Sequence, residues 1–476
     1  MAMIDTLPRG IAKAVIAETP LSLRKLFRSY TTRAEEIDVE LSTRAYRTSY
    51  TFGASDFMDL QQEKLGQLLA WAARTPYWRG HLGVAAGEQP RIGSISDIEQ
   101  FPSTSRSTLI EAPLASRSNE RLLGYYPTIL GHTSGSTGQP LQFYRSPRSG
   151  IRTRALYRII MEQAARAGGI TPQSPRVLNL ALFQQREVYP WVGFVPGLLL
   201  ESGRRWRDDF YRFVEAARPD ILYVNTAFLK RLHYWFEIDR FFYQLRAIVY
   251  IVHALEARER EITQKFFRCP LISLYGTQEC SVIGVECPHR RDQFHVFPEL
   301  GYAEVLDDAG RPTAGVGNVT YTYFENDVSP FIRYQLGDRG SIERSASCPC
   351  GRTSDLITFD GRVSDFIELS TGQAVIGKAL FRTLDTLLAG KIWQYQLVQK
   401  GFELLTIRVV PMDTLRSEDE KAALAAVADL LEGGIRLTME RVPYLEPTPG
   451  GKVPQLVKCN LATRTGPGGK LLSSNC

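Results

Sequence analysis

Apolar and polar positions follow different patterns in the two halves of the chain. Residues 56–74 place apolar side chains on one face of a helix. Short apolar runs then alternate with helical patterns, at 176–182, 220–229, 246–255 and 270–276. Strands that are separated by helices are typical of a mostly parallel sheet with both faces covered. Ligands of such sheets bind where the strands end at their carboxyl edge.

The pattern changes near residue 300. Residues 301–343 alternate, with turn signals at 307–310 and at Gly315 and Gly317, which predicts antiparallel hairpins. Farther on, a hairpin is expected over 393–410, with its turn at Lys400-Gly401. A helix follows, from a capping box at Ser417–Glu420 to a stop at Gly433.

These patterns predict an α/β protein with two domains. Residues 1–360 form a large N-terminal domain with mostly parallel sheets and an antiparallel β subdomain. Residues 361–476 form a small C-terminal α+β lid domain.

Composition adds exclusions. The chain has 57 Lys and Arg against 51 Asp and Glu, and 44% of its residues are hydrophobic. Such values exclude a disordered chain, a collagen-like repeat and a polybasic nucleic-acid arm. Seven cysteines, an odd number, argue against a secreted disulfide framework. No apolar run resembles a signal peptide or approaches the roughly 18–20 residues of a spanning helix. We therefore expect a cytoplasmic protein that neither binds nucleic acid nor inserts into membranes.

The strongest local sign of chemistry is a run of small hydroxyl residues and glycines. It consists of Thr133, Ser134, Gly135, Ser136, Thr137 and Gly138. Such a loop lets backbone N–H groups approach an anion while the hydroxyls add donors, so it suits a polyphosphate. It lacks the Gly-x4-Gly-Lys-Ser/Thr spacing of a Walker A motif. An ordinary Ser/Gly surface loop is the alternative.

Further motifs follow in a recognisable order. They are Tyr275-Gly276-Thr277-Gln278-Glu279, Arg333–Asp338, Gly361–Asp365 and Pro449–Lys452. In order and spacing the set resembles the core motifs of the adenylate-forming superfamily of acyl-CoA synthetases and adenylation domains, over about residues 60–460. The segment Cys348-Pro349-Cys350-Gly351-Arg352 shortly before Gly361 is similar to the phenylacetate–CoA ligase-like branch.

The resemblance implies a nucleotide site. The loop at 133–138 would hold the β- and γ-phosphates of ATP, and Tyr275, followed by Gly276 and Thr277, would pack against adenine. Asp338 would accept hydrogen bonds from the ribose. Glu279 would help to hold Mg²⁺, a cation that prefers carboxylate and phosphate oxygens.

The resemblance also implies a moving lid. Lys452 would neutralise charge as a substrate carboxylate attacks the α-phosphate, and the small domain would rotate about residues 362–365, beginning at Arg362. The acid, expected to be aromatic, would pass from the adenylate to coenzyme A.

Other outcomes remain open at this stage. The same first step could load a carrier-protein thiol or an amine. Gln278, Gln335-Leu336 and Ser364 differ from the usual residues of the superfamily, which favours a third possibility, a non-catalytic zinc-stabilised paralogue. The retained Glu279, Asp338 and Lys452 favour activity.

A second constellation suggests a metal. Cys287, His295, Cys348 and Cys350 supply three sulfurs and one imidazole, which match a closed tetrahedral Zn²⁺ site with a structural role. His289 rivals His295 as the histidine ligand, and buried free cysteines are the alternative.

Other residues have simpler interpretations. We expect Cys280 and the aromatic residues at 234–243 in the core, Arg204–Arg207 in a solvated turn, and Tyr223, Asn225 and Phe228 in the acyl pocket.

Overall fold

The structure is a computed structural model. It describes residues 32–123, 128–133, 140–171, 175–180, 191–192, 204–252, 255, 257–344, 348–362, 366–371, 373–432, 434–445 and 453–459. Within these ranges no helix is long and apolar enough to cross a membrane.

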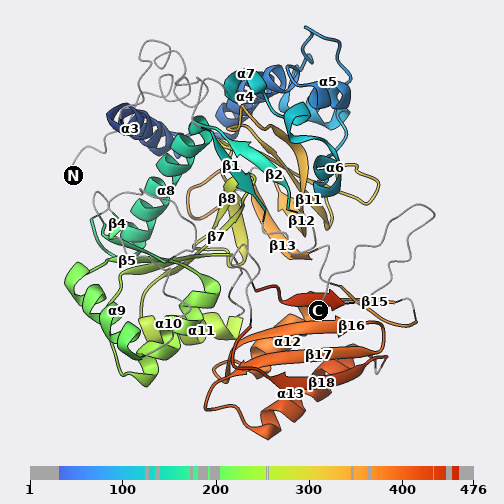
Figure 1. The fold of residues 1–476 in the computed structure, drawn as a ribbon. Coiled ribbons are helices and arrows are strands. Elements are labelled where there is room, and N and C mark those ends of the chain that lie inside the picture. Colours follow the sequence, from blue (N-terminus) through green and yellow to red (C-terminus); the bar gives the residue numbers. More distant parts are fainter. Residues whose placement is uncertain are drawn as a thin grey trace.

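A sheet of eleven strands forms the centre of the large unit (Figure 1), in the order β10-β11-β12-β13-β9-β8-β7-β6-β5-β3-β4. One half is parallel and contains β3 (Val177–Leu180), β4 (Trp191–Val192), β5 (Ile221–Asn225), β6 (Ala247–Ile251) and β7 (Leu271–Thr277). The predicted parallel sheet is therefore confirmed.

Helices cover both faces of the parallel half because its strands are apolar on both sides. Ile221 and Tyr223 of β5 share a core with α8 (Pro147–Ala167). Leu222 and Val224 point to a second core, which they share with α9 (Arg204–Ala217) and α10 (Thr226–Ile238). Successive side chains of a strand alternate between its faces, so one apolar run fills two cores. α11 (Ala257–Phe267) precedes β7.

Two local predictions need correction. The apolar run at 220–229 contains a strand and the start of a helix, because the Asn225 side chain accepts a hydrogen bond from the Phe228 N–H at 2.8 Å and thereby caps α10. Residues 204–207 begin α9 and do not form a turn, since Arg207 pairs with Asp239 at 2.6 Å. The aromatic segment after them is largely core, with Trp235 and Phe236 buried and Phe242 exposed.

The other half of the sheet is antiparallel, as predicted for 301–343. It contains β8 (Ser281–Glu286), β9 (Gln293–Val296), β10 (Gly301–Leu306), β11 (Gly317–Tyr323), β12 (Phe331–Glu343) and β13 (Leu356–Arg362). The change of direction occurs at the turn between β7 and β8, which lies at the carboxyl edge of the parallel strands.

N-terminal helices and a hairpin complete the large unit. They are α3 (Thr32–Ser49), α4 (Ala54–Ala72), α5 (Pro76–Leu82), η1 (Ile95–Gln100), α6 (Arg106–Glu111), η2 (Leu114–Arg117), α7 (Glu120–Leu123), β1 (Ile129–His132) and β2 (Gln142–Arg145). α4 confirms the helix predicted at 56–74, although it ends at Ala72.

A buried ionic cluster ties α4 and α8 to the segment after β11. The Glu325 carboxylate pairs with Lys64 of α4 and, at 2.7 Å, with Arg148 of α8. Burial alone would raise the pKa of Glu325, but the surrounding cations outweigh it and lower the pKa to about 2.

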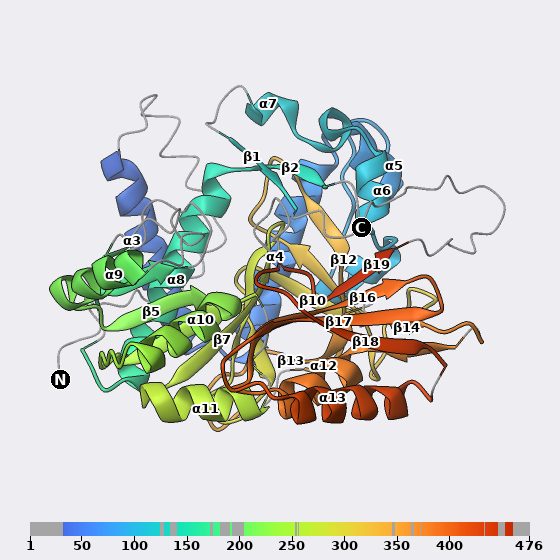
Figure 2. The same ribbon diagram turned by 60° about the horizontal axis from the view of Figure 1, so that its bottom comes forward.

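The C-terminal part has its own sheets and its own core (Figures 1 and 2). Its elements are β14 (Phe366–Glu368), β15 (Ala374–Ile376), α12 (Gly377–Leu387), β16 (Ile392–Lys400), β17 (Leu404–Pro411), α13 (Ser417–Leu430), β18 (Arg436–Arg441) and β19 (Leu456–Cys459). The larger sheet, in the order β18-β17-β16-β19, is mixed. The small unit thus matches the predicted α+β class.

The hairpin and the helix of the small unit are confirmed with one shift. β16 and β17 are antiparallel across a turn at Gly401, whose φ of 63° is in the left-handed region. The cap of α13 lies one residue before the predicted one, because the Asp419 side chain accepts from the Arg416 N–H at 3.0 Å. The helix ends at Leu430, before the predicted stop.

Candidate nucleotide and metal sites

The hairpin of β1 and β2 frames the hydroxyl-rich loop. The Thr133 N–H donates to the Leu141 carbonyl, and the Leu141 N–H donates back to the Thr133 hydroxyl, each at 3.0 Å. These two bonds close the base of the loop. The predicted phosphate contacts Ser134, Gly135, Ser136, Thr137 and Gly138 lie outside the described residues, so their role stays a prediction.

The predicted adenine and ribose residues meet between β7 and β12. The Tyr275 hydroxyl donates to Asp338 Oδ2 at 2.6 Å, although 63 residues separate them in the chain. The Tyr275 ring packs against Phe359 of β13, with centroids 4.0 Å apart. Asp338 is paired across the β12–β13 ladder with Arg362. The backbone of the predicted hinge residue therefore lies beside the predicted ribose ligand.

The turn after β7 holds the predicted Mg²⁺ ligand. A Cβ on Gly276 would lie 2.4 Å from the Ser281 carbonyl oxygen, so the close approach of β8 requires glycine there. The Thr277 hydroxyl accepts from the Cys280 N–H at 3.0 Å, which closes the turn. Cys280 is fully buried, as predicted.

Glu279 lies in this turn and is 9% exposed. Its carboxylate accepts a hydrogen bond from the Tyr334 hydroxyl at 3.0 Å. Burial, and then Glu279 itself, raise the pKa of Tyr334, so that hydroxyl stays a donor. A carboxylate held by a neutral phenol suits a hard cation such as Mg²⁺.

Arg145 is a further residue of this site that was not predicted from the sequence. Arg145 ends β2, and its Nη2 donates to the Gln278 carbonyl at 2.8 Å and to Gln278 Oε1 at 2.6 Å. The bonds connect the phosphate-loop hairpin to the turn that carries Glu279. A basic residue at the end of a short strand is ordinarily solvated, so only its position, a few residues after the loop, could have drawn attention to it.

The lid lysine has no described geometry. Lys452 lies outside the described residues, and of Arg362 only the backbone is described. The described residues nearest to Lys452 in the chain lead into β19, which is paired with β16. The catalytic roles of both residues remain predictions.

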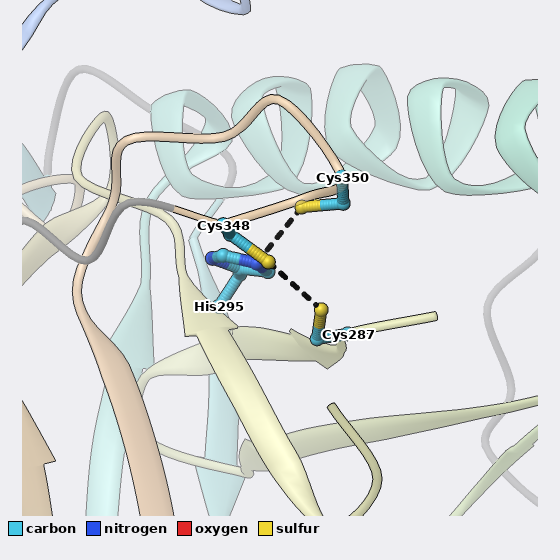
Figure 3. Close-up of side chains that lie close together, drawn as sticks. All are labelled: Cys287, His295, Cys348 and Cys350. Atoms are coloured by element: carbon cyan, nitrogen blue, oxygen red, sulfur yellow. Dashed lines mark hydrogen bonds between the residues drawn. The ribbon is translucent and has the colours of Figure 1, made fainter. Parts of the chain in front are cut away.

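The four proposed zinc ligands converge in one place (Figure 3). The ligand atoms of Cys287, His295, Cys348 and Cys350 all lie within 4.8 Å of one another. Cys287 Sγ is 3.2 Å from Cys348 Sγ, and Cys350 Sγ is 3.1 Å from His295 Nε2. Three thiols and an imidazole at this separation fit a tetrahedral Zn²⁺ site without an open position.

The histidine of the cluster is His295 and not its rival. His295 is fully buried, whereas His289 is exposed and is not a member of the cluster. His295 Nδ1 lies 3.2 Å from the Ser354 hydroxyl, and this contact orients the ring with Nε2 toward the sulfurs. Burial, helped by the Arg352 charge, lowers the pKa of His295 to about 4, so the imidazole is neutral and can bind a metal at neutral pH.

Comparisons with known proteins gave matches among solved structures alone. No protein-family model and no curated protein matches the chain. A 2-hydroxyisobutyryl-CoA ligase in the postadenylation state matches at 18% identity with a TM-score of 0.64, over 87% of this chain and 92% of that one. An open conformation of that ligase, with 2-HIB-AMP and CoA, gives a TM-score of 0.53 at 18% identity, over 86% and 92%.

A second ligase is also similar. The anthranilate CoA ligase AuaEII in complex with anthranoyl-AMP matches at 17% identity with a TM-score of 0.51, over 77% of this chain and 71% of that one. Likeness at such identities concerns the fold, and it confirms the predicted α/β class with a large and a small unit. The chain has the fold of adenylate-forming acyl-CoA ligases.

Proposed function

We propose that the protein uses ATP and Mg²⁺ to activate a carboxylic acid as its acyl-adenylate and then transfers the acyl group to coenzyme A. The observation that carries the proposal is the hydrogen bond of Tyr275 to Asp338, which is paired with Arg362 across the β12–β13 ladder. Glu279 lies in the turn that follows the strand of Tyr275. Residues of three motifs that are far apart in the sequence thus meet around one edge of the sheet, where ligands of α/β folds bind.

Each group would act on a different part of the nucleotide. The Tyr275 ring would pack on adenine, Asp338 would accept the ribose hydroxyls, and the 133–138 loop would donate to the phosphates. Glu279 would hold Mg²⁺, which would neutralise phosphate charge. Lys452 would come in from the lid and stabilise the charge that develops as the carboxylate attacks.

The acceptor is proposed as coenzyme A because the two enzymes whose solved structures are reported above are CoA ligases of this fold. A carrier-protein thiol and an amine are the alternatives. The aryl nature of the acid and the phenylacetate–CoA ligase-like branch are also proposals. The Cys/His cluster supports the branch, and we propose that it binds a structural zinc ion.

Pyrophosphate exchange tests the proposal. Labelled pyrophosphate should enter ATP only when a suitable acid from an aryl and aliphatic panel is present, and thioester should form when CoA is added. A carrier protein or amine that replaces CoA would change the acceptor alone. No exchange with any acid, in protein that binds ATP, would favour a non-catalytic paralogue.

Replacing Lys452 tests the lid. Lys452→Ala should slow adenylation by about 10²-fold or more, because one preorganised charge contributes that much in comparable sites. Its affinity for ATP, measured by calorimetry, should stay within about threefold, since Asp338 and the 133–138 loop remain. Lys421→Ala, an exposed lysine of α13, is the matched control. Unchanged adenylation in Lys452→Ala would contradict the role.

A further inference from the structure

Arg145 is a half-buried cation with neutral partners. Its two described hydrogen bonds go to Gln278, an uncharged residue, and both come from Nη2. Among the residues that the structure describes it has no carboxylate partner. The 134–139 segment of the neighbouring loop contains no Asp or Glu. The remaining N–H groups of the guanidinium, on Nε and Nη1, make no hydrogen bond to any residue that the structure describes.

The surroundings make such a cation costly without an electronegative partner. Burial lowers the pKa of Arg145, while nearby Tyr323, Glu279 and Tyr157 act in the opposite direction. A guanidinium withdrawn from water is stable when its donors are paired. Because Arg145 Nη2 donates to both the carbonyl oxygen and Oε1 of Gln278, the arginine side chain is held in one orientation before any ligand binds.

Helix α8 connects the turn that holds Arg145 to β5, because its Thr153 hydroxyl is 2.9 Å from the hydroxyl of Ser281 at the end of that turn. The Tyr157 hydroxyl of α8 is 3.0 Å from the Tyr223 hydroxyl of β5, and both residues are buried. Burial raises the pKa of Tyr157, and the hydrogen bond with Tyr223 and the charge of Arg145 oppose this rise. Asp338 lies on β12, and β12 and β5 are on opposite sides of β7 in the sheet order.

A second donor lies at the end of β5. Asn225 ends β5, two residues after Tyr223, and its Oδ1 is used to cap α10. Its Nδ2 is buried and has no hydrogen-bond partner among the described residues. A buried amide donor without a partner is uncommon in folded proteins, and a bound ligand is one way to satisfy it.

We propose that Arg145, together with Asn225 Nδ2, binds an oxygen substituent of the acid other than its reacting carboxylate. The enzyme would then select hydroxy, oxo or dicarboxylic acids over the corresponding unsubstituted acids. A hydrocarbon in this place would leave the guanidinium and the amide unpaired, and such sites discriminate strongly against analogues that lack the polar group. The inference rests on the proposed adenylation activity.

The test uses pairs of acids with the same carbon skeleton, one with and one without the oxygen substituent, in the pyrophosphate exchange assay. The wild type should prefer the substituted acid of at least one pair by about tenfold or more in kcat/KM. Arg145→Met should lose most of that preference, through a higher KM for the substituted acid, and its KM for ATP should stay within about threefold. Arg145→Lys should restore part of the preference.

Controls separate this role from a structural one. Asn225→Ser keeps a helix cap but removes the amide donor, so it should also reduce the preference without unfolding α10. Arg212→Met, at an exposed arginine of α9, should change nothing. Thermal unfolding identifies any variant that fails to fold, and the Asn225→Ser result still decides the question in that case.

The outcomes are distinguishable. Equal losses for all acids, or a raised KM for ATP in Arg145→Met, would overturn the inference and assign Arg145 to the phosphates or to the fold, while the proposed function would stand. A wild type that shows no preference within any pair would also overturn it. Absence of exchange with every acid would remove the proposed function and the inference together.

Discussion

The Tyr275 hydroxyl donates a hydrogen bond to Asp338, whose carboxylate the proposed function assigns to ribose. Asp338 accepts its hydrogen bond at 2.6 Å through Oδ2, and a carboxylate can accept further hydrogen bonds from a nucleoside on its two oxygens. The aromatic contact with Phe359 does not depend on that hydrogen bond and can hold the ring in place when the hydroxyl is released. Under the proposed function, Tyr275 and Asp338 would thus form a preorganised surface for a nucleoside.

Removal of the carboxylate gives the first residue-scale prediction. Asp338→Ala should weaken ATP binding by roughly tenfold or more, because a hydrogen bond to a charged group contributes about 1.5–3 kcal/mol. Calorimetric titration with ATP measures the effect. Asp308→Ala, an exposed carboxylate with a surface ion pair to Arg339, is the control and should bind as the wild type does. Equal affinity of Asp338→Ala and wild type would contradict the ribose assignment.

At the same scale, motif residues could be predicted where chemistry restricts the residue type. The roles of Tyr275, Glu279 and Asp338 follow from the resemblance of their motifs to those of the adenylate-forming superfamily and stay predictions, whereas three of the four metal-cluster positions were recognised as cysteines. His289 and His295 could not be separated in the sequence, because burial depends on the strand pairing that places His295 in β9. Arg145 was not predicted as a site residue, because its partner Gln278 is 133 residues away in the chain.

At the scale of elements, the Cys/His cluster joins the end of β8, strand β9 and the turn before β13. Cys287 follows β8 directly, His295 belongs to β9, and Cys348 and Cys350 precede β13. A metal ion there would stabilise the start of β13. Arg362 lies at the opposite end of that strand, where it is paired with Asp338 of β12. A metal ion in the cluster would therefore stabilise the strands of the proposed nucleotide site.

Removal of two thiols should release the metal. Purified protein should contain about one zinc per chain, and the double change Cys348→Ser, Cys350→Ser should abolish it and lower the thermal unfolding midpoint. Elemental analysis and calorimetry measure the two effects. Cys269→Ser, at a buried cysteine outside the cluster, should keep the zinc. Wild-type protein that contains no zinc when purified without chelators would disprove the site.

The sequence predicted helices and strands correctly where the burial of their side chains produces a regular hydrophobic pattern. β5 and β6 are apolar on both faces, and the sequence showed this as uninterrupted apolar runs. The start of α9 was missed because four residues, three of them arginines, look solvated, whereas Arg207 is held in the helix by Asp239. The boundary between β5 and α10 was missed because a cap, and no change of hydrophobicity, ends the strand.

At the scale of the whole molecule, the small unit lies against α10, α11 and β13 of the large one (Figure 2). Trp393 of β16 packs edge-on against Tyr234 of α10, with ring centroids 3.7 Å apart. The TM-score to the 2-hydroxyisobutyryl-CoA ligase falls from 0.64 for its postadenylation state to 0.53 for its open conformation. The relative placement of the two units is therefore more similar to that in the postadenylation state than to that in the open conformation. The Trp393–Tyr234 pair is one contact that stabilises this placement.

If the small unit moves as a lid, loss of this contact should shift its position without unfolding either unit. Trp393→Ala removes an aromatic pair worth about 0.5–1.5 kcal/mol beyond its buried area, so the arrangement seen here should lose population by about two- to tenfold. Hydrogen exchange should become faster in α10 and at the start of β16, while the core of the small unit, built around Leu397 and Ile407, stays protected. Phe242→Ala, at an exposed aromatic residue just after α10, is the control. Faster exchange throughout the small unit would mean that Trp393 supports its folding, and unchanged exchange in α10 would mean that other contacts fix the lid.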